Sequence, residues 1–269
     1  YQEIKKDFNN INKLKNKVYL ININYNFNKT FDKITIKSKN YISECFKVGL
    51  KFLNQGLSDK IINGPISKKH FLEKKYPGIT EFIFDKSKRK ISKKPVMLLY
   101  NRKLSISPLT THIPLKKVSE NINQNLIINN ITTINNFLKR NLKKKPRIAI
   151  LGINPHCESK SQKNEENLII KPAINKLKKK KINLNGPFAA DTFFIKKNIS
   201  NYNAVVGIYH DQVLTPFKAL YGFDASNITL GLPFLRMSVD HGPNQSMLGK
   251  NISSTQSLEN IFNFIFLLK

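Results

Sequence analysis

The sequence predicts a layered α/β fold, and three observations support that prediction. The chain has 269 residues, 40% of them hydrophobic, which is enough for one large or two medium domains with buried cores. Short apolar runs bounded by turn residues recur along it, as expected of strands that are buried on both faces of a parallel sheet. Longer stretches with apolar residues at helical spacing lie between these runs, and strands that alternate with helices are typical of α/β proteins.

Five apolar runs are the expected strands. In chain order they are KVYLINI at 17–23, KIING at 60–64, PVMLLY at 95–100, RIAILGINP at 147–155 and AVVGIYH at 204–210. Helices are expected at three amphipathic stretches, 43–55, 118–142 and 166–179. Ser43 is the expected N-cap of the first helix, because a serine side chain accepts a hydrogen bond from a free backbone N–H of the first turn.

The formal net charge is +29, from 46 Lys and Arg against 17 Asp and Glu. One interpretation is attraction to the phosphates of a nucleic acid or membrane. The other is a composition rich in lysine, asparagine and isoleucine, of the kind that an AT-biased genome produces. The lysines are spread along the whole chain, RNA-recognition motifs are absent, and the densest run, Lys178 to Lys181, has the pattern of a solvated helix end. We therefore expect no nucleic acid as a main partner, and a basic surface that attracts an anionic substrate.

The two cysteines, Cys45 and Cys157, show neither zinc-ligand spacing nor a disulfide framework. We expect reduced thiols in the cytoplasm, so a bound metal has to rely on histidine and carboxylate ligands. No apolar run approaches the roughly 20 residues of a transmembrane helix. The chain begins with Tyr1 and no signal-peptide pattern follows, which indicates an N-terminally incomplete soluble protein.

Three of the five histidines come at the ends of expected strands. They are His112 in TTHIPL, His156 in GINPHCES and His210 in GIYHDQ. In open α/β sheets, ligands bind beyond the carboxyl ends of the strands. Three imidazoles brought there can converge on one divalent cation and leave positions open for a substrate. A lone histidine at such a place is more often structural, so the residues alone leave both interpretations open.

Other charged and polar side chains follow turns near these segments. Lys68 lies in NGPISKK and Asp191 in GPFAADTFF. A longer segment, 217–244, carries Lys218, Asn227, Arg236, Asp240 and His241. Lysine and arginine together indicate recognition of a phosphate or a carboxylate. The alternative for these cations is ordinary surface charge.

At these residues the sequence resembles the 4-hydroxythreonine-4-phosphate dehydrogenase family of pyridoxal phosphate biosynthesis. The matching segments follow in family order from about Lys60 to the C-terminus, whereas residues 1–59 match only loosely. They are NGPISK, YPGITEF, TTHIPL, GINPH, NGPFAADTFF, YHDQVLTPFK, GFDASNITLGLPFLRMSVDHG and a following Gly249. Several long motifs in the correct order are far more specific than a lone glycine-rich fingerprint.

The resemblance implies a fold like that of isocitrate and isopropylmalate dehydrogenases, with two α/β domains and an active-site cleft between them. Residues 1–80 plus 240–269 would form the first domain, and residues 81–239 the second, with the metal site and the dimer interface. Such enzymes are homodimers whose active site draws on both subunits. The implied cofactors are NAD or NADP and a divalent zinc, magnesium, cobalt or manganese ion, and nitrogen ligands favour the softer ions over magnesium.

The resemblance also implies roles for individual residues. The metal ligands would be His112, His156 and His210, and the substrate-binding positions would be Ile79, Thr80, Lys218, Asn227 and Arg236. The cofactor-binding positions would be His241, Gly242 and Gly249. Lys68 or Asp240 would transfer protons. Beside the roles that the resemblance implies, we expect at most a supporting role for Asp211, next to His210.

The implied reaction is the metal- and NAD-dependent oxidation of 4-phosphooxy-threonine, with decarboxylation to 3-amino-2-oxopropyl phosphate. Three departures from the family pattern bear on substrate and cofactor. Ile79 replaces a substrate-contacting histidine, CESKSQKNEE replaces a glycine-rich loop, and Ser246 stands at an acidic position of the cofactor loop. The alternatives are therefore a related dehydrogenase acting on threonate or erythronate 4-phosphate, a basic nucleic-acid-binding protein on the same scaffold, and an inactive homologue.

Overall fold

The computed structural model describes residues 2–4, 17–73, 75–76, 78–87, 94–142, 145–158 and 161–268. The chain divides into two compact units. Unit 1 comprises Tyr1–Ser92, Leu232–Arg236 and His241–Ser253, and unit 2 comprises Lys93–Gly231, Met237–Asp240 and Ser254–Lys269. This division differs from the expected one, because residues 81–92 belong to unit 1 and the C-terminal residues from Ser254 belong to unit 2.

Unit 1 combines short strands with helices, as the alternating pattern predicts. Its described elements are β1 (Gln2–Glu3), β2 (Tyr19–Leu20), η2 (Ile36–Ser38), α1 (Lys39–Asn54), β3 (Lys60–Asn63), α2 (Lys68–Phe71), α3 (Ile79–Lys86) and η7 (Gln245–Met247). Strands β1 and β2 pair in parallel. The strand expected over 17–23 is therefore confirmed only for the two residues of β2.

Helix α1 begins earlier than the sequence predicts. The 3-10 turn η2 precedes it, and the side-chain oxygen of Thr35 accepts a hydrogen bond from the backbone N–H of Lys37 at 3.3 Å. Because η2 leads directly into α1, Ser38 is the N-cap and Ser43 lies inside the helix. The prediction of Ser43 as the N-cap is wrong.

One face of α1 supplies much of the core of unit 1. Phe46, Leu50 and Leu53 recur at helical spacing and are between 1% and 6% exposed. They pack in one cluster with Ile79 and Ile83 of α3. Burying a side chain of this size contributes about 1.5–3 kcal/mol relative to leaving it in water. The apolar periodicity of 43–55 thus identified a buried helix face correctly.

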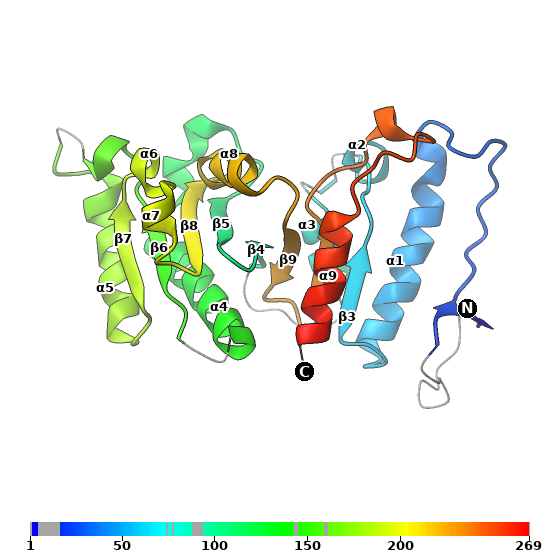
Figure 1. Cartoon of the computed structure of the whole chain (residues 1–269), viewed down its shortest axis with the longest axis horizontal. Helices are drawn as coiled ribbons and strands as arrows, with labels where there is room; N and C mark the ends of the chain where they lie inside the picture. The colour runs from blue at the N-terminus through cyan, green and yellow to red at the C-terminus, as the bar shows by residue number, and fades with distance from the viewer. Residues whose placement is uncertain are drawn as a thin grey trace. The chain divides into compact units, whose positions relative to one another are not determined.

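Unit 2 is organised around a mixed sheet (Figure 1). Its strands are β4 (Val96–Tyr100), β5 (Ser105–Thr110), β6 (Ile148–Leu151), β7 (Leu184–Phe188), β8 (Ala204–Tyr209) and β9 (Ser226–Leu230), and the residues of β10 (Leu235–Val239) are divided between the two units. Its longer helical segments are α4 (Gln124–Leu142), the π-helix η6 (Glu166–Ile170), α5 (Lys171–Lys179), α8 (His210–Tyr221) and α9 (Gln256–Leu267). Its short ones are η3 (Leu115–Lys117), η4 (Ser119–Asn121), η5 (Pro155–Cys157), α6 (Ala190–Phe193) and α7 (Lys196–Ile199).

Six strands of unit 2 lie in the order β9-β4-β5-β8-β6-β7. Strands β5, β8, β6 and β7 run parallel, which confirms the parallel direction predicted for the runs that became β6 and β8. Strand β4 is antiparallel to both of its neighbours, β5 and β9, so the prediction of a parallel strand is wrong there. The reason is the connection between Tyr100 and Ser105, which is far shorter than the dozen or so residues that a parallel crossover needs.

Two helices begin differently from the predictions for 118–142 and 166–179. Helix α4 starts at Gln124 rather than at 118, because Asn123 caps it: its side-chain oxygen accepts a hydrogen bond from the backbone N–H of Leu126 at 2.9 Å. The stretch 166–179 begins as the π-helix η6 and continues as α5.

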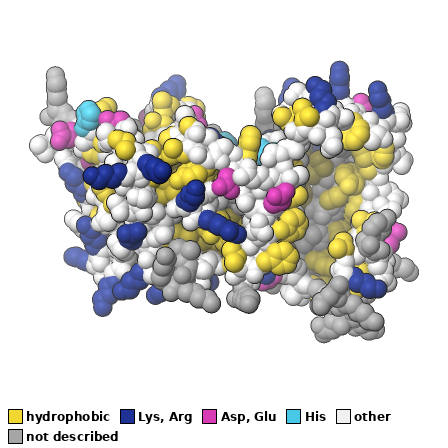
Figure 2. Space-filling view, viewed as in Figure 1, with side chains coloured by type: hydrophobic (Ala, Val, Ile, Leu, Met, Phe, Trp, Pro, Cys, Tyr) yellow, Lys and Arg dark blue, Asp and Glu magenta, His cyan; other side chains and the backbone are white. Residues whose placement is uncertain are grey.

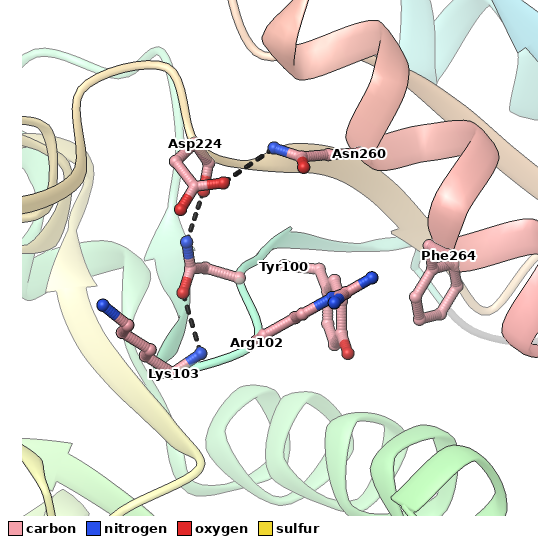
Figure 3. Close-up of a pocket in the computed structure, with 7 residues that line it drawn as sticks. Tyr100, Arg102, Lys103, Asp224, Asn260 and Phe264 are labelled. Carbon is pink, nitrogen blue, oxygen red and sulfur yellow. Dashed lines mark hydrogen bonds between the residues drawn. The ribbon is translucent and has the colours of Figure 1, made fainter.

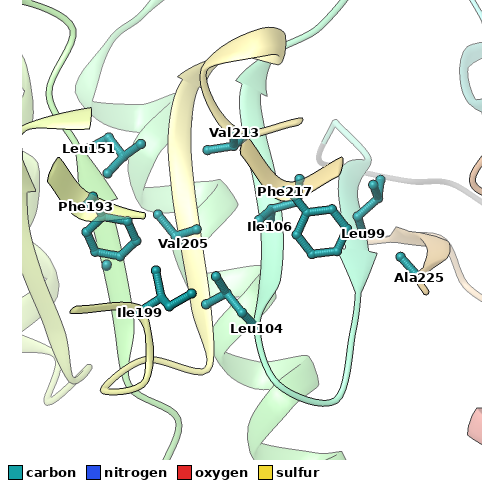
Figure 4. Close-up of a cluster of buried hydrophobic side chains, with 11 residues drawn as sticks. Leu99, Leu104, Ile106, Leu151, Phe193, Ile199, Val205, Val213, Phe217 and Ala225 are labelled. Atoms are coloured by element: carbon teal, nitrogen blue, oxygen red, sulfur yellow. The ribbon is translucent and has the colours of Figure 1, made fainter. Parts of the chain in front are cut away.

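Helices cover both faces of the unit 2 sheet. On one face, Val213 and Phe217 of α8 pack in an apolar cluster with Ile106 of β5 (Figure 4). On the other face, Asn130 of α4 donates a hydrogen bond to the hydroxyl of Ser107 at 3.3 Å. Consecutive residues of a strand point to opposite faces, so α8 and α4 lie on opposite sides of β5.

Lys and Arg side chains are scattered over the face of the molecule shown in Figure 2, with acidic side chains among them. The run Lys178 to Lys181 is exposed at the end of α5, as predicted. Among the described residues, no helix combines the length and the apolar character needed to cross a membrane.

Candidate active site

The three strand-end histidines follow three neighbouring parallel strands. His112 comes two residues after β5, His156 five residues after β6, and His210 directly after β8. The order β5-β8-β6 makes β8 the central strand of the three. The predicted placement of the histidines at the carboxyl ends of strands is therefore confirmed, while their role as metal ligands stays a prediction.

His112 and His210 lie together. The register pairs Thr110 of β5 with Tyr209 of β8, so the two histidines leave adjacent strands at the same level. Their ring centroids are 5.6 Å apart. The Nδ1 atom of His210 lies 2.6 Å from the Oδ1 atom of Asp211, within hydrogen-bond distance. A carboxylate on Nδ1 orients an imidazole and leaves Nε2 available to a ligand.

His156 does not join this pair. It sits on the turn η5 with a left-handed φ of 55°, and its Nδ1 atom lies 3.8 Å from the Oδ2 atom of Asp191. Within the described parts of the chain, no three His, Cys, Asp or Glu side chains form a group that could hold a metal ion. His112 and His210 are placed to supply two imidazole ligands to one divalent cation. His156, the third expected ligand, lies apart from them.

Lys218 and Asp240, expected to bind substrate and to move protons, form an ion pair with each other. Lys218 lies on α8, and the side chain of Asp240 is fully buried after β10. The backbone N–H of Asp240 donates to the hydroxyl of Ser257, which in turn donates to the carbonyl of Ala225 at 2.6 Å. Removing Lys218 would leave the buried Asp240 carboxylate without its cation, which is unfavourable. This pair therefore holds the Lys218 ammonium in place.

Arg236 is a buried cation among the predicted site residues. It is 3% exposed, and its Nε atom donates to the side-chain oxygen of Asn63 at 2.9 Å. Its Nη1 atom donates more weakly to the hydroxyl of Thr80, at 3.4 Å. Burial lowers the pKa of Arg236 to about 10, against the opposing influence of Glu81. The structure thus brings two of the expected substrate-binding residues, Thr80 and Arg236, into contact.

Ile79 precedes Thr80 on α3, but its side chain lies in the apolar core of unit 1 and is only 7% exposed. Asn227 is on β9, where its side-chain oxygen is buried and has no hydrogen-bond partner among the described residues. An unpaired buried acceptor is costly and fits a ligand that donates a hydrogen bond.

The remaining predicted residues lie in unit 1. Lys68 is the exposed first residue of α2. His241 donates from Nδ1 to the carbonyl oxygen of Gly242 at 3.1 Å. Gly249 has a φ of 71°, which favours glycine, and a Cβ there would lie 3.5 Å from the ring of Phe31.

Two residues near the histidines were missed by the sequence analysis, Gln212 and Glu166. Both are buried. The Gln212 amide bridges the strands that carry His210 and His156, and the Glu166 carboxylate binds the loop of His156. Gln212 bonds to Gly152, 60 residues away in sequence, and Glu166 bonds to Ile153, 13 residues away. No local sequence pattern could therefore predict these contacts.

A separate small cavity, of about 140 Å³, lies in unit 2 near the amino-terminal end of β5, away from the strand ends that precede the histidines (Figure 3). Tyr100 lines it at the end of β4, which runs antiparallel to β5. Within it, the amide of Asn260 donates to the Oδ1 atom of Asp224 at 2.8 Å, and the amide of Asn101 donates to the carbonyl of Asp224. This cavity is distinct from the place where His112 and His210 lie together.

The fold and the histidine pair define a mixed α/β protein with a candidate metal-dependent active site at the carboxyl edge of its parallel strands. The sequence matches the family of the pyridoxal phosphate biosynthetic protein PdxA over residues 1–265. The chain belongs to the PdxA family and is a dehydrogenase of that family.

Individual relatives agree with this assignment. The 4-hydroxythreonine-4-phosphate dehydrogenase of Sulfurihydrogenibium sp. is 35% identical over 269 residues, which cover 98% of this chain and 82% of that protein. The D-threonate 4-phosphate dehydrogenase of Pectobacterium atrosepticum is 36% identical over 201 residues, 74% of this chain and 61% of that protein. The crystal structure of a 4-hydroxythreonine-4-phosphate dehydrogenase from Burkholderia phymatum superposes with a TM-score of 0.75 at 26% identity, covering 99% of this chain and 82% of that one.

Proposed function

We propose that the protein oxidises 4-phosphooxy-threonine with NAD or NADP and a divalent cation, with decarboxylation to 3-amino-2-oxopropyl phosphate. The observation that carries the proposal is the histidine pair of this PdxA-family chain, with ring centroids 5.6 Å apart at the ends of two adjacent parallel strands. In this proposal His112 and His210 bind the cation and His156 is the third ligand. A divalent cation supplies a Lewis acid that stabilises negative charge on the substrate oxygen.

The cationic residues account for binding of an anionic substrate. In the proposal, Lys218, Arg236 and Thr80 bind the phosphate and carboxylate groups, and Asn227 uses its unpaired side-chain oxygen to accept a hydrogen bond from the substrate. His241, Gly242 and Gly249 contribute to the nicotinamide cofactor site. The proposal includes a second copy of the chain, which completes the active site.

Lys68 is our choice for proton transfer. The substrate hydroxyl loses its proton as hydride passes to the nicotinamide, and the enolate left after loss of carbon dioxide gains one. Both steps need a group that can exchange protons with solvent, and Lys68 is exposed whereas the Asp240 carboxylate is buried against Lys218. We therefore assign Asp240 to holding Lys218.

A second substrate is supported by two specific observations. The relative from Pectobacterium atrosepticum is a D-threonate 4-phosphate dehydrogenase, at an identity similar to that of the 4-hydroxythreonine-4-phosphate dehydrogenases. Ile79, where the family pattern has a histidine, lies in the core and offers no hydrogen-bonding atom to an amino acid substrate. Threonate or erythronate 4-phosphate is therefore the alternative.

The deciding experiment measures reduction of NAD and of NADP by the purified protein with each of the phosphorylated acids, with and without added Zn²⁺ or Mg²⁺. We expect turnover with 4-phosphooxy-threonine that requires the cation and is lost in Lys68→Met. Turnover with threonate 4-phosphate alone would replace the first substrate by the second. Absence of turnover with every substrate, together with salt-sensitive retention on DNA, would contradict the proposal of a dehydrogenase.

A further inference from the structure

The loop that carries His156 has an unusual backbone. Between β6 and the end of η5, His156 and Cys157 adopt left-handed φ angles of 55° and 60°. Left-handed conformations are unfavourable for residues with a Cβ atom and persist only where the surroundings hold them. The loop is therefore fixed by contacts outside itself.

Glu166 supplies most of these contacts. Its side chain is fully buried at the start of the π-helix η6. Its Oε1 atom accepts hydrogen bonds from the backbone N–H groups of Ile153 at 2.8 Å and Asn154 at 2.9 Å. Its Oε2 atom accepts a third from the side-chain amide of Asn154 at 2.7 Å. A π-helical turn often marks a functional site, and here it places a carboxylate against the loop.

The start of the loop is held from the other side by Gln212. Its amide donates to the carbonyl of Gly152 at 2.7 Å, and its side-chain oxygen accepts from the backbone N–H of Ile208 at 2.7 Å. Gly152 itself leaves little room, since a Cβ there would lie 2.6 Å from the sulfur of Cys157 and 3.0 Å from the Oε1 atom of Glu166. The loop is thus enclosed between η6 and α8, the helix that begins with His210.

We infer that Glu166 is a positioning residue of the active site: its buried carboxylate fixes the backbone of the loop 152–157, from which the His156 side chain has to turn toward His112 and His210 to serve as a cation ligand. Glu166 acts through the loop and does not touch the substrate. The inference rests on the proposed function, because that function gives His156 its role. A carboxylate suits the task because two oxygens without protons accept three hydrogen bonds from Ile153 and Asn154 at once.

The test is a set of variants with nearly constant side-chain volume. Glu165 is the matched control: it is the neighbouring carboxylate, only partly buried, and it accepts a hydrogen bond from the Asn154 side chain at 3.0 Å. In Glu166→Gln, the new NH2 group faces the NH2 group of Asn154, so two donors meet and the hydrogen bond between the side chains is lost. Adding Asn154→Asp places a carboxylate oxygen opposite the new NH2 group, which restores a hydrogen bond in the reverse direction. Both variants with Glu166→Gln are made in the Glu165→Gln protein, which is their reference, so that no two carboxylates are brought together by the exchange.

Two readouts separate positioning from simple stability. The first is Zn²⁺ affinity of the folded full-length protein, measured by competition with a chromophoric chelator, and the second is amide hydrogen exchange at Ile153 and Asn154. We expect Glu166→Gln to weaken Zn²⁺ binding about 10–100-fold and to accelerate exchange at both amides, with affinity regained when Asn154→Asp is added. If Glu166→Gln does not fold, Asn154→Leu tests the same contact and is expected to weaken Zn²⁺ binding in the same direction.

Three outcomes decide the matter. Unchanged Zn²⁺ affinity in Glu166→Gln would overturn the inference, even if amide exchange accelerates, because Glu166 would then serve stability alone. Weakened Zn²⁺ binding that Asn154→Asp restores supports it. The same weakening in a protein that reduces no NAD or NADP with any of the phosphorylated acids supports the positioning role while contradicting the proposed substrates.

Discussion

The ends of β8 and β6 present a histidine in two different ways. Strand β8 passes directly into α8, so His210 is the first residue of a helix and its backbone follows from the strand and the helix on either side. Strand β6 is followed by a loop, and His156 is reached only after five residues, with left-handed backbone at His156 and Cys157. A histidine at a strand–helix junction is placed by local hydrogen bonds, whereas a histidine on a loop depends on distant side chains.

The largest expected effect comes from removing the histidine at the end of β8. His210→Ala is expected to weaken Zn²⁺ binding by more than about 100-fold, beyond the loss that follows when only the partner of a ligand is changed. The measurement is Zn²⁺ content and affinity of the folded protein. Undiminished metal content in this variant would refute the ligand assignment.

The corresponding change at the end of β6 sharpens the comparison. His156→Ala should lower Zn²⁺ affinity as strongly as His210→Ala if both strand ends serve one cation. A full complement of tightly bound Zn²⁺ in His156→Ala would show that the two ends have different roles, and would leave His112 and His210 as the metal pair.

A smaller effect is expected from the carboxylate beside His210. Asp211→Asn weakens the contact with Nδ1, which is 2.6 Å long in the native protein, and should cost about 10-fold in Zn²⁺ affinity, the lower end of the usual range for such partners. Asp191→Asn is the matched change at the end of β6, where the carboxylate is 3.8 Å from His156 and outside hydrogen-bond range. Equal losses in the two variants would contradict the difference that the distances indicate.

Breaking the bridge between the two strand ends should act on stability. Gln212→Met removes both hydrogen bonds of a residue that is 8% exposed and leaves the Gly152 carbonyl and the Ile208 N–H unpaired. The expected loss is about 1–3 kcal/mol in the free energy of unfolding, measured in urea. Gln55→Met, at an exposed position, is the control and should stay within about 0.5 kcal/mol of the native protein.

The smallest expected effect is a dependence of folding stability on pH that arises from Glu166, which binds the loop after β6. Burial raises the pKa of Glu166, but the hydrogen bonds from Asn154 and Ile153 outweigh it, so that the net pKa lies below the ordinary value. A carboxylate whose pKa is lower in the folded protein stabilises it above the unfolded-state pKa, and this contribution is lost as the pH falls through the folded-state pKa. The stability difference between native protein and Glu166→Gln should therefore shrink in acid. A difference that grows as the pH falls, in urea unfolding at a series of pH values, would contradict this sign.

Much of unit 2 could be predicted from local patterns. The apolar runs at 95–100, 147–155 and 204–210 correspond to β4, β6 and β8, and the periodicity of 118–142 corresponds to α4. The strand ends before His156 and His210 were predictable for the same reason, since a continuous apolar run that stops at a polar residue marks where a buried strand ends. Strand β5 was indicated only by His112 after it and is absent from the predicted apolar runs, because the polar residues and the proline of SISPLT hide a segment that is buried throughout.

The sequence by itself determined the family, the strands with their terminal histidines and the apolar faces of the helices, because these depend on neighbours along the chain. Only the tertiary structure decided the antiparallel direction of β4, the pairing of Lys218 with Asp240, and the hold of Gln212 and Glu166 on the His156 loop. It also separated His156 from the pair formed by His112 and His210. The physical reason is that these features join atoms from segments far apart in sequence, and which polar groups meet is set by how buried strands and helices pack rather than by any local pattern.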